Sequence, residues 1–156
     1  MTTSDSGFIH APAADYPGWY TWDLTDQTLF NPQVMGRLLV REETVPGGAR
    51  MVRLRMFPER RHANLLDTVH GGVTLALIDI ALFSGMRLIL EADAAGSVTL
   101  DLSTQFIGAA CIGQPLDAIS EVLRETRRLV FMRGTIEQDG QLIAAFNGTL
   151  RKPSSH

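Results

Sequence analysis

The chain of 156 residues is long enough for one domain with a sizeable core, and its 45% apolar and 20% charged residues are ordinary for a globular protein. The formal net charge of −3 gives no general attraction to nucleic acid or to an anionic membrane, so neither is predicted as a partner. The single cysteine, Cys111, excludes a disulfide within the chain and favours a reducing compartment, which predicts a cytoplasmic location.

Residues 1–30 are expected to form an N-terminal arm on a main domain of residues 31–156. This arm lacks the basic start and apolar core of a secretory signal. Trp19 and Trp22 fall close together, and large aromatic side chains bury well, so they should anchor the arm to the domain. A short helix is expected over residues 26–33.

Runs that are rich in apolar residues, several of them alternating with polar ones, predict a series of strands. These strands cover residues 36–45, 49–57, 97–107, 115–124, 129–137 and 141–150. Pro46-Gly47-Gly48 and Asp139-Gly140 are tight-turn signals, so each predicts a hairpin. The last four strands are expected to follow one another as a meander.

One helix is predicted over residues 71–91, between the second and third strands. It is apolar on nearly every face, which is typical of a helix enclosed by other structure. The run is long enough to cross a membrane, but Asp79 and Arg87 interrupt it, and charges at such depth are costly. The predicted fold is α+β, with a curved antiparallel sheet of about six strands wrapped around one long central helix. No second layer covers the rest of the sheet, so an oligomer is expected.

Asp79 lies near the middle of this apolar helix, where an unpaired carboxylate costs free energy. Arg87 is about 12 Å further along the helix, beyond the reach of an i,i+4 pair. The carboxylate must therefore meet a group outside its own helix. Either a structural partner or a catalytic role would satisfy that requirement.

Gly71 and Gly72 open the helix and leave free N–H groups at its positive end. Such donors can hold a developing oxyanion, although a plain loop-to-helix turn explains the same pair of glycines. Gly71 and Asp79 are separated by about 12 Å of helix, whereas an oxyanion donor and a base must both lie about 3 Å from the reacting atoms. If both residues act, the spacing predicts two sites shared across a dimer interface.

Other chemistries find little support in the sequence. His62 and His70 have no third ligand at a recognisable spacing, so no metal site is predicted. Cys111 has no catalytic motif around it, and the chain has no phosphate loop and no dinucleotide fingerprint. No cofactor is therefore expected.

The motif His62-x-Asn64-x5-His70-Gly71-Gly72, followed by Asp79 on a long helix, resembles the hotdog-fold thioesterases of the phenylacetic-acid-degradation type. Two later segments match as well, Val98-Thr99-Leu100-Asp101 at the start of a strand and Asp139-Gly140-Gln141-Leu142-Ile143-Ala144 near the end. The resemblance covers roughly residues 35–152. It implies hydrolysis of acyl- or aryl-coenzyme A thioesters at a dimer interface.

The resemblance also implies catalytic roles for individual residues. The Gly71 N–H is the oxyanion donor, Asp79 is the general base or the nucleophile, and a hydroxyl at Thr99 contacts the attacking water. Asn64 helps to position water or substrate, and His70 belongs to the same catalytic motif.

Other positions bear on substrate binding. Gly72 and Phe83 are expected to line the substrate site. Arg127 and Arg128 belong to a basic cluster at a strand turn, which either binds the phosphates of coenzyme A or is simply solvated. Asp67 stands where the family commonly has glycine, and the turn should survive because Asp tolerates positive φ better than most residues.

The leading hypothesis is an acyl-coenzyme A thioester hydrolase that acts as a homodimer or a dimer of dimers. A hotdog hydratase or dehydratase acting on acyl thioesters is the first alternative, and a non-catalytic acyl-coenzyme A-binding protein is the second.

Overall fold

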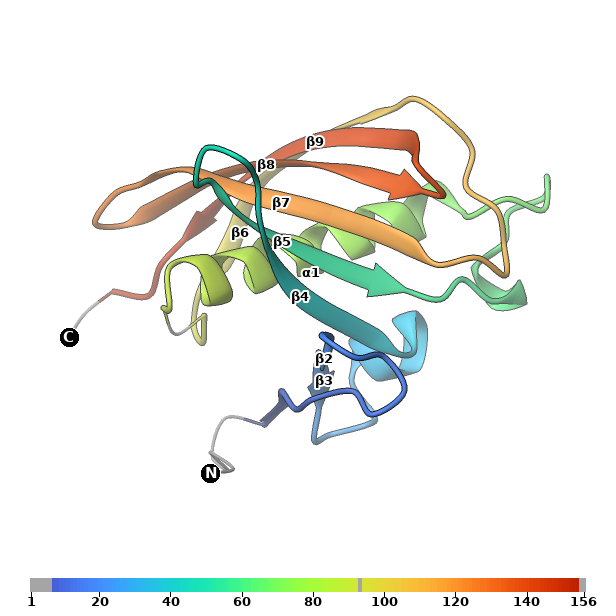
Figure 1. The fold of residues 1–156 in the computed structure, drawn as a ribbon, viewed down its shortest axis with the longest axis horizontal. Coiled ribbons are helices and arrows are strands. Elements are labelled where there is room, and N and C mark those ends of the chain that lie inside the picture. The colour runs from blue at the N-terminus through green and yellow to red at the C-terminus, as the bar shows by residue number, and fades with distance from the viewer. Residues whose placement is uncertain (1–6, 93, 155–156) are drawn as a thin grey trace.

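The computed structural model describes residues 7–92 and 94–154. The elements, in chain order, are β1 (Phe8–Ile9), β2 (Tyr20–Thr21), β3 (Asp23–Leu24), η1 (Asn31–Met35), β4 (Leu38–Thr44), β5 (Arg50–Met56), η2 (Arg60–His62), α1 (Gly71–Ile89), β6 (Val98–Phe106), β7 (Leu116–Glu125), β8 (Leu129–Gln138) and β9 (Gln141–Arg151). An antiparallel sheet of seven strands has the order β2-β4-β5-β7-β8-β9-β6, and β1 pairs separately with β3. Figure 1 shows α1 lying along one face of the curved sheet. The predicted fold class is confirmed.

The observed bounds of the long strands and the helix agree with the predicted bounds to within a few residues. The order of the strands in the sheet differs from the prediction at one place. β6 pairs with β9, and β7 pairs with β5 as well as with β8. The prediction of a four-strand meander is therefore wrong for β6, because the segment between β6 and β7 carries the chain across the sheet. β6 consequently lies at one edge. The short helix also begins later than predicted, as the π-helical turn η1.

Alternation along the strands builds the core between the sheet and α1. Val52, Leu54 and Met56 of β5 are completely buried, whereas the residues between them are only partly covered. From the helix, Leu82 is completely buried against the sheet, and burial of such a side chain stabilises the fold by about 1.5–3 kcal/mol. Gly148 of β9 permits this close approach, since a Cβ atom there would stand 2.5 Å from Leu82 Cδ1.

One side of α1 is left open. By length and composition the helix could cross a membrane, with a mean hydropathy of 1.7, yet only half of it is buried inside the fold. Gly72 is exposed, Leu75 is 37% exposed, and Asp79 is only partly covered. The expectation of a helix enclosed on all sides is thus wrong for the single chain, because the sheet wraps only part of its circumference.

The N-terminal region packs through its aromatic residues, with Trp19 in a separate cluster beside Leu39 and Trp22 in the main core that includes α1. Trp19 and Trp22 are 5% and 6% exposed, as expected of anchoring side chains. The guanidinium groups of Arg41 and Arg55 each lie 4.5 Å from the centre of the Trp19 ring. Hydrogen bonding to Asp117 raises the pKa of Arg55, so this cation stays charged beside the ring. The boundary of the arm at residue 30 stays a prediction.

Candidate active site

Asp79 meets its partner on the edge strand. The Thr99 hydroxyl donates a hydrogen bond of 2.6 Å to Asp79 Oδ1, and both residues are partly buried. The partner that the sequence required outside the helix is therefore Thr99, the position that the family resemblance had indicated. A carboxylate with one oxygen held by a hydroxyl keeps its second oxygen for another contact.

A β-bulge explains how Thr99 reaches the helix. The register of β6 against β9 shifts between Thr99 and Asp101, so Thr99 lies opposite Leu150 while Leu102 lies opposite Gly148. Leu150 and Gly148 both face α1, and one extra residue in β6 therefore lets Thr99 and Leu102 share that face. A regular strand over 97–107 would have put these two residues on opposite faces.

The other end of the site is the start of α1, where His70 acts as the N-cap. Its Nδ1 atom accepts a hydrogen bond of 2.9 Å from the Gly72 N–H, and its carbonyl accepts from the Val73 N–H. In the described part of the chain no acceptor takes the Gly71 N–H. The N–H groups that follow Gly71 are thus hydrogen-bonded to His70, whereas the Gly71 N–H stays available at the positive end of the helix.

The loop before the helix is held by Asn64. Its Oδ1 atom accepts hydrogen bonds from the Leu66 and Thr68 N–H groups at 2.9 and 3.1 Å, and its Nδ2 donates to the Thr68 hydroxyl. In this conformation Asn64 stabilises the turn. Asp67 has φ +58° and forms an ion pair with Arg60, so the expectation that an aspartate would preserve this turn is confirmed.

The remaining predicted residues lie around these two ends. Phe83 is one turn beyond Asp79 on α1 and packs partly against the core. Arg127 and Arg128 lie exposed in the turn between β7 and β8, with no ion-pair partner among residues 7–92 and 94–154. This turn is at the Thr99 end of the sheet, since Leu129 and Val98 both pair with Arg151.

One chain does not bring the two ends together. Gly71 and Asp79 belong to the same continuous helix, so about 12 Å of helix rise separates them, as the sequence predicted. β6 runs alongside this stretch in the opposite direction. Thr99 touches Asp79, while the Phe106 ring lies 3.5 Å from the place of a Gly71 Cβ atom.

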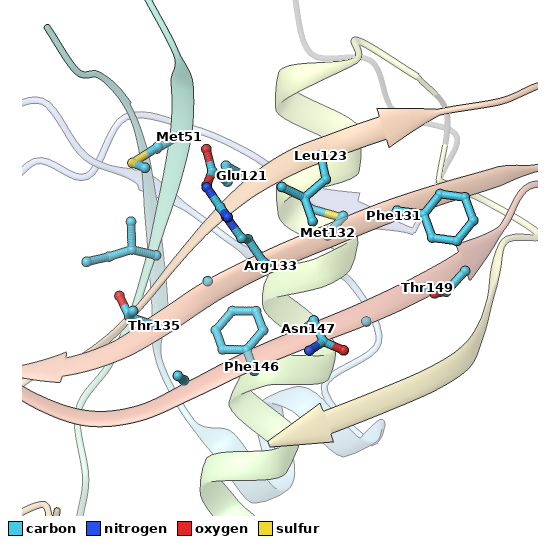
Figure 2. A pocket seen from close by; sticks show the side chains of 14 residues that line it. Met51, Glu121, Leu123, Phe131, Met132, Arg133, Thr135, Phe146, Asn147 and Thr149 are labelled. Carbon is cyan, nitrogen blue, oxygen red and sulfur yellow. The ribbon is translucent and has the colours of Figure 1, made fainter. Parts of the chain in front are cut away.

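One surface hollow adjoins the predicted site, and a second lies away from it. One, of about 750 Å³, is next to the Asn64 loop and is lined in part by Asn64 and His70. The other, of about 570 Å³, lies on the sheet face opposite α1 and contains none of the predicted site residues (Figure 2). There Arg133 reaches Glu121 across β7 and β8 at 2.5 Å. This second hollow is separated from Asp79 by the sheet itself.

Fold and site together define an α+β protein of the hotdog type, with a carboxylate on its central helix. The family model described as the thioesterase superfamily matches residues 66–145, so the chain belongs to this superfamily. The predicted family and the predicted enzyme class, a thioester hydrolase, are thereby confirmed.

Individual relatives agree with this assignment. Acyl-coenzyme A thioesterase 13 of Mus musculus is 28% identical over 120 residues, which cover 76% of this chain and 84% of the relative. The crystal structure of zebrafish thioesterase superfamily member 2 is 28% identical, has a TM-score of 0.57, and matches over 72% of this chain and 80% of its own. The E. coli PaaI protein of the phenylacetic acid degradation operon shares the fold with a TM-score of 0.62 at 16% identity, over 80% and 84% of the two chains.

Proposed function

We propose that this protein hydrolyses acyl- or aryl-coenzyme A thioesters at two sites, each built by two copies of the chain. Water adds to the thioester carbonyl, the coenzyme A thiol leaves, and a carboxylic acid is released. Asp79 acts as the general base that takes the water proton, or as the nucleophile that displaces the thiolate and forms a mixed anhydride, which water then hydrolyses to free the acid and regenerate Asp79. The Gly71 N–H stabilises the oxyanion.

The Asp79–Thr99 hydrogen bond is the observation that carries this proposal. It fixes a carboxylate on the open side of α1, where a substrate has access. The free Gly71 N–H supplies the second element that thioester hydrolysis needs, a donor aimed at developing negative charge.

The direction of β6 supports a site shared between two chains. β6 is an edge strand, and unpaired strand edges favour pairing with another strand. If two β6 edges pair antiparallel about Leu102, the middle residue of the strand, Thr99 comes opposite the partner's Gln105 and next to the partner's Phe106. Because Thr99 touches Asp79 and Phe106 touches Gly71, this pairing carries Asp79 towards the partner's Gly71. Gly71 and Asp79 of one chain are about 12 Å apart, but Asp79 of one chain and Gly71 of its partner can then act on the same substrate.

Exposed apolar side chains gather around the same edge. Leu100 and Phe106 of β6 are 53% and 52% exposed, and Ile107 follows at 51%. In the Asn64 loop, Leu65 and Leu66 are almost fully exposed although their backbone is held in a defined turn. Apolar side chains in this number beside an unpaired strand are typical of an interface.

The remaining assignments follow from the reaction. Arg127 and Arg128 are proposed to bind the phosphates of coenzyme A, because free cations at the Thr99 end of the sheet favour an anionic ligand there. The reaction as written uses only water and needs no cofactor. A cytoplasmic location is proposed on the basis of the lone Cys111.

A panel of acyl- and aryl-coenzyme A thioesters, followed by the release of free thiol, tests this function. We expect turnover of at least one member without added metal. Loss of an enoyl thioester's conjugated double bond without thiol release would instead identify a hydratase. Binding of thioesters without any turnover would identify a binding protein.

Thr99→Val is expected to slow kcat by roughly a few-fold to tenfold, with KM nearly unchanged. Valine keeps the shape and removes the hydroxyl that holds Asp79. Ser97→Ala is the matched control, because the buried Ser97 hydroxyl has no hydrogen-bond partner in the described structure. Steady-state kinetics that found Ser97→Ala damaging and Thr99→Val silent would contradict the role given to Thr99.

A further inference from the structure

Gln138 is a buried polar side chain that none of the catalytic assignments uses. It ends β8, immediately before the Asp139-Gly140 turn, and is 6% exposed. Its Oε1 accepts the Cys111 N–H at 2.6 Å, and its Nε2 donates to the carbonyls of Cys111 and Gln114 at 3.0 and 3.2 Å. A buried amide with three hydrogen bonds to one segment fixes that segment's position.

The segment that Gln138 holds is itself the support of the catalytic loop. It connects β6 to β7 and has little regular structure of its own. The Ala110 carbonyl accepts a hydrogen bond of 2.9 Å from the Val69 N–H, and Cys111 forms an isolated β-bridge with Thr68. Cys111 is therefore held by the Gln138 side chain while it also pairs with Thr68.

Val69 directly precedes the start of the helix. The next residue, His70, donates its N–H to the His62 carbonyl at 2.9 Å, caps α1 and carries the peptide bond whose N–H belongs to Gly71. The hydrogen bonds of Gln138 to Cys111 and of Val69 to the neighbouring Ala110, joined by the covalent backbone, thus link Gln138 to the peptide that carries the proposed oxyanion donor. No other side chain in the described structure is hydrogen-bonded to the Cys111 backbone.

We propose that Gln138 is a positioning residue for the Gly71 N–H. This inference rests on the proposed function, because it assumes that the Gly71 N–H is the oxyanion donor. It assigns the placement of that donor to a side chain on β8, far from Gly71 in the sequence. Without the amide, the 108–114 segment can shift away from Thr68 and Val69. The Gly71 N–H then no longer points at the position of the oxyanion. A displacement of about 1 Å at such a donor is enough to cost up to 100-fold in rate.

The test compares Gln138→Met with Gln141→Met in the full chain. Methionine matches glutamine in length and makes none of the three hydrogen bonds. Gln141 lies directly opposite Gln138 in the same hairpin, but its side chain is exposed. We expect Gln138→Met to lower kcat by about 10- to 100-fold with KM changed by less than about threefold, and Gln141→Met to change neither.

A second readout does not depend on turnover. In protein labelled with ¹⁵N-glycine, the Gly71 amide signal should shift in Gln138→Met and stay in place in Gln141→Met. Gln138→Asn is the milder variant, which keeps the uncharged amide on a side chain one methylene shorter, so its kcat should fall between those of Gln138→Met and the wild type.

The outcomes separate the two proposals. If Gln138→Met leaves both the kcat per folded molecule and the Gly71 amide signal unchanged, the role of Gln138 is overturned. A change in KM alone overturns it as well. A wild-type chain that hydrolyses no thioester overturns the proposed function, whereas a shifted Gly71 signal in the same samples still supports the positioning by Gln138. If Gln138→Met does not fold, the same two readouts on Gln138→Asn decide the question.

Discussion

Replacing Asp79 with asparagine is expected to lower kcat by about 10²–10⁴-fold while the fold stays intact. Asparagine has the same shape, and its oxygen can still accept the hydrogen bond from Thr99. It can neither take a proton from water nor attack a carbonyl. The loss corresponds to about 2.7–5.5 kcal/mol of transition-state stabilisation. Thiol release under saturating substrate measures it directly.

The control for this change is Asp139→Asn. Asp139 is exposed at a hairpin turn with φ +48°, a position that asparagine accepts as readily as aspartate. It should leave both kcat and the melting temperature close to wild type. Near-normal turnover in Asp79→Asn would show that the Asp79 carboxylate is only a structural partner of Thr99 and has no catalytic role.

Gly71→Pro is expected to lower kcat by about 10²–10³-fold, the usual loss when one oxyanion donor is removed. Proline is well accepted at the first position of a helix, where the missing N–H has no helical partner. The preceding His70 already has the extended conformation that proline requires, with φ −63° and ψ 137°. The substitution therefore removes the proposed donor with little disturbance to the helix.

Gly71→Ala separates the lost N–H from the added bulk. A Cβ atom at Gly71 would lie 3.5 Å from Phe106, an ordinary contact, and alanine keeps the N–H. The alanine variant should be far more active than the proline variant, with similar circular dichroism in both. Equal losses in the two variants would show that space at Gly71, and not its N–H, matters for turnover.

Local patterns were sufficient to predict most of the fold. Alternation and the Pro46-Gly47-Gly48 turn predicted the β4–β5 hairpin, and an apolar run without a break predicted α1. The need for a partner of Asp79 outside its helix was also accessible, because an unpaired carboxylate there costs free energy, whereas Thr99 itself was indicated only by the family resemblance. The Asp67 turn followed from the tolerance of aspartate for positive φ.

Features that depend on contacts between distant segments were not predictable in this way. The position of β6 at the sheet edge results from a crossover whose length alone does not reveal its path. The bulge after Thr99 leaves no signature in an alternating sequence. Gln138 is an unremarkable glutamine until its three hydrogen bonds to a distant loop are seen.

Complementation in a mixed dimer tests the shared site most directly. Chains carrying Asp79→Ala or Gly71→Pro, each with a different affinity tag, are co-expressed and purified through both tags. Such a heterodimer holds one site with intact Asp79 and intact Gly71 and one site with neither. The account predicts roughly half of the wild-type activity per dimer, although both parent homodimers are nearly inactive. A heterodimer no more active than its parents would contradict the shared site.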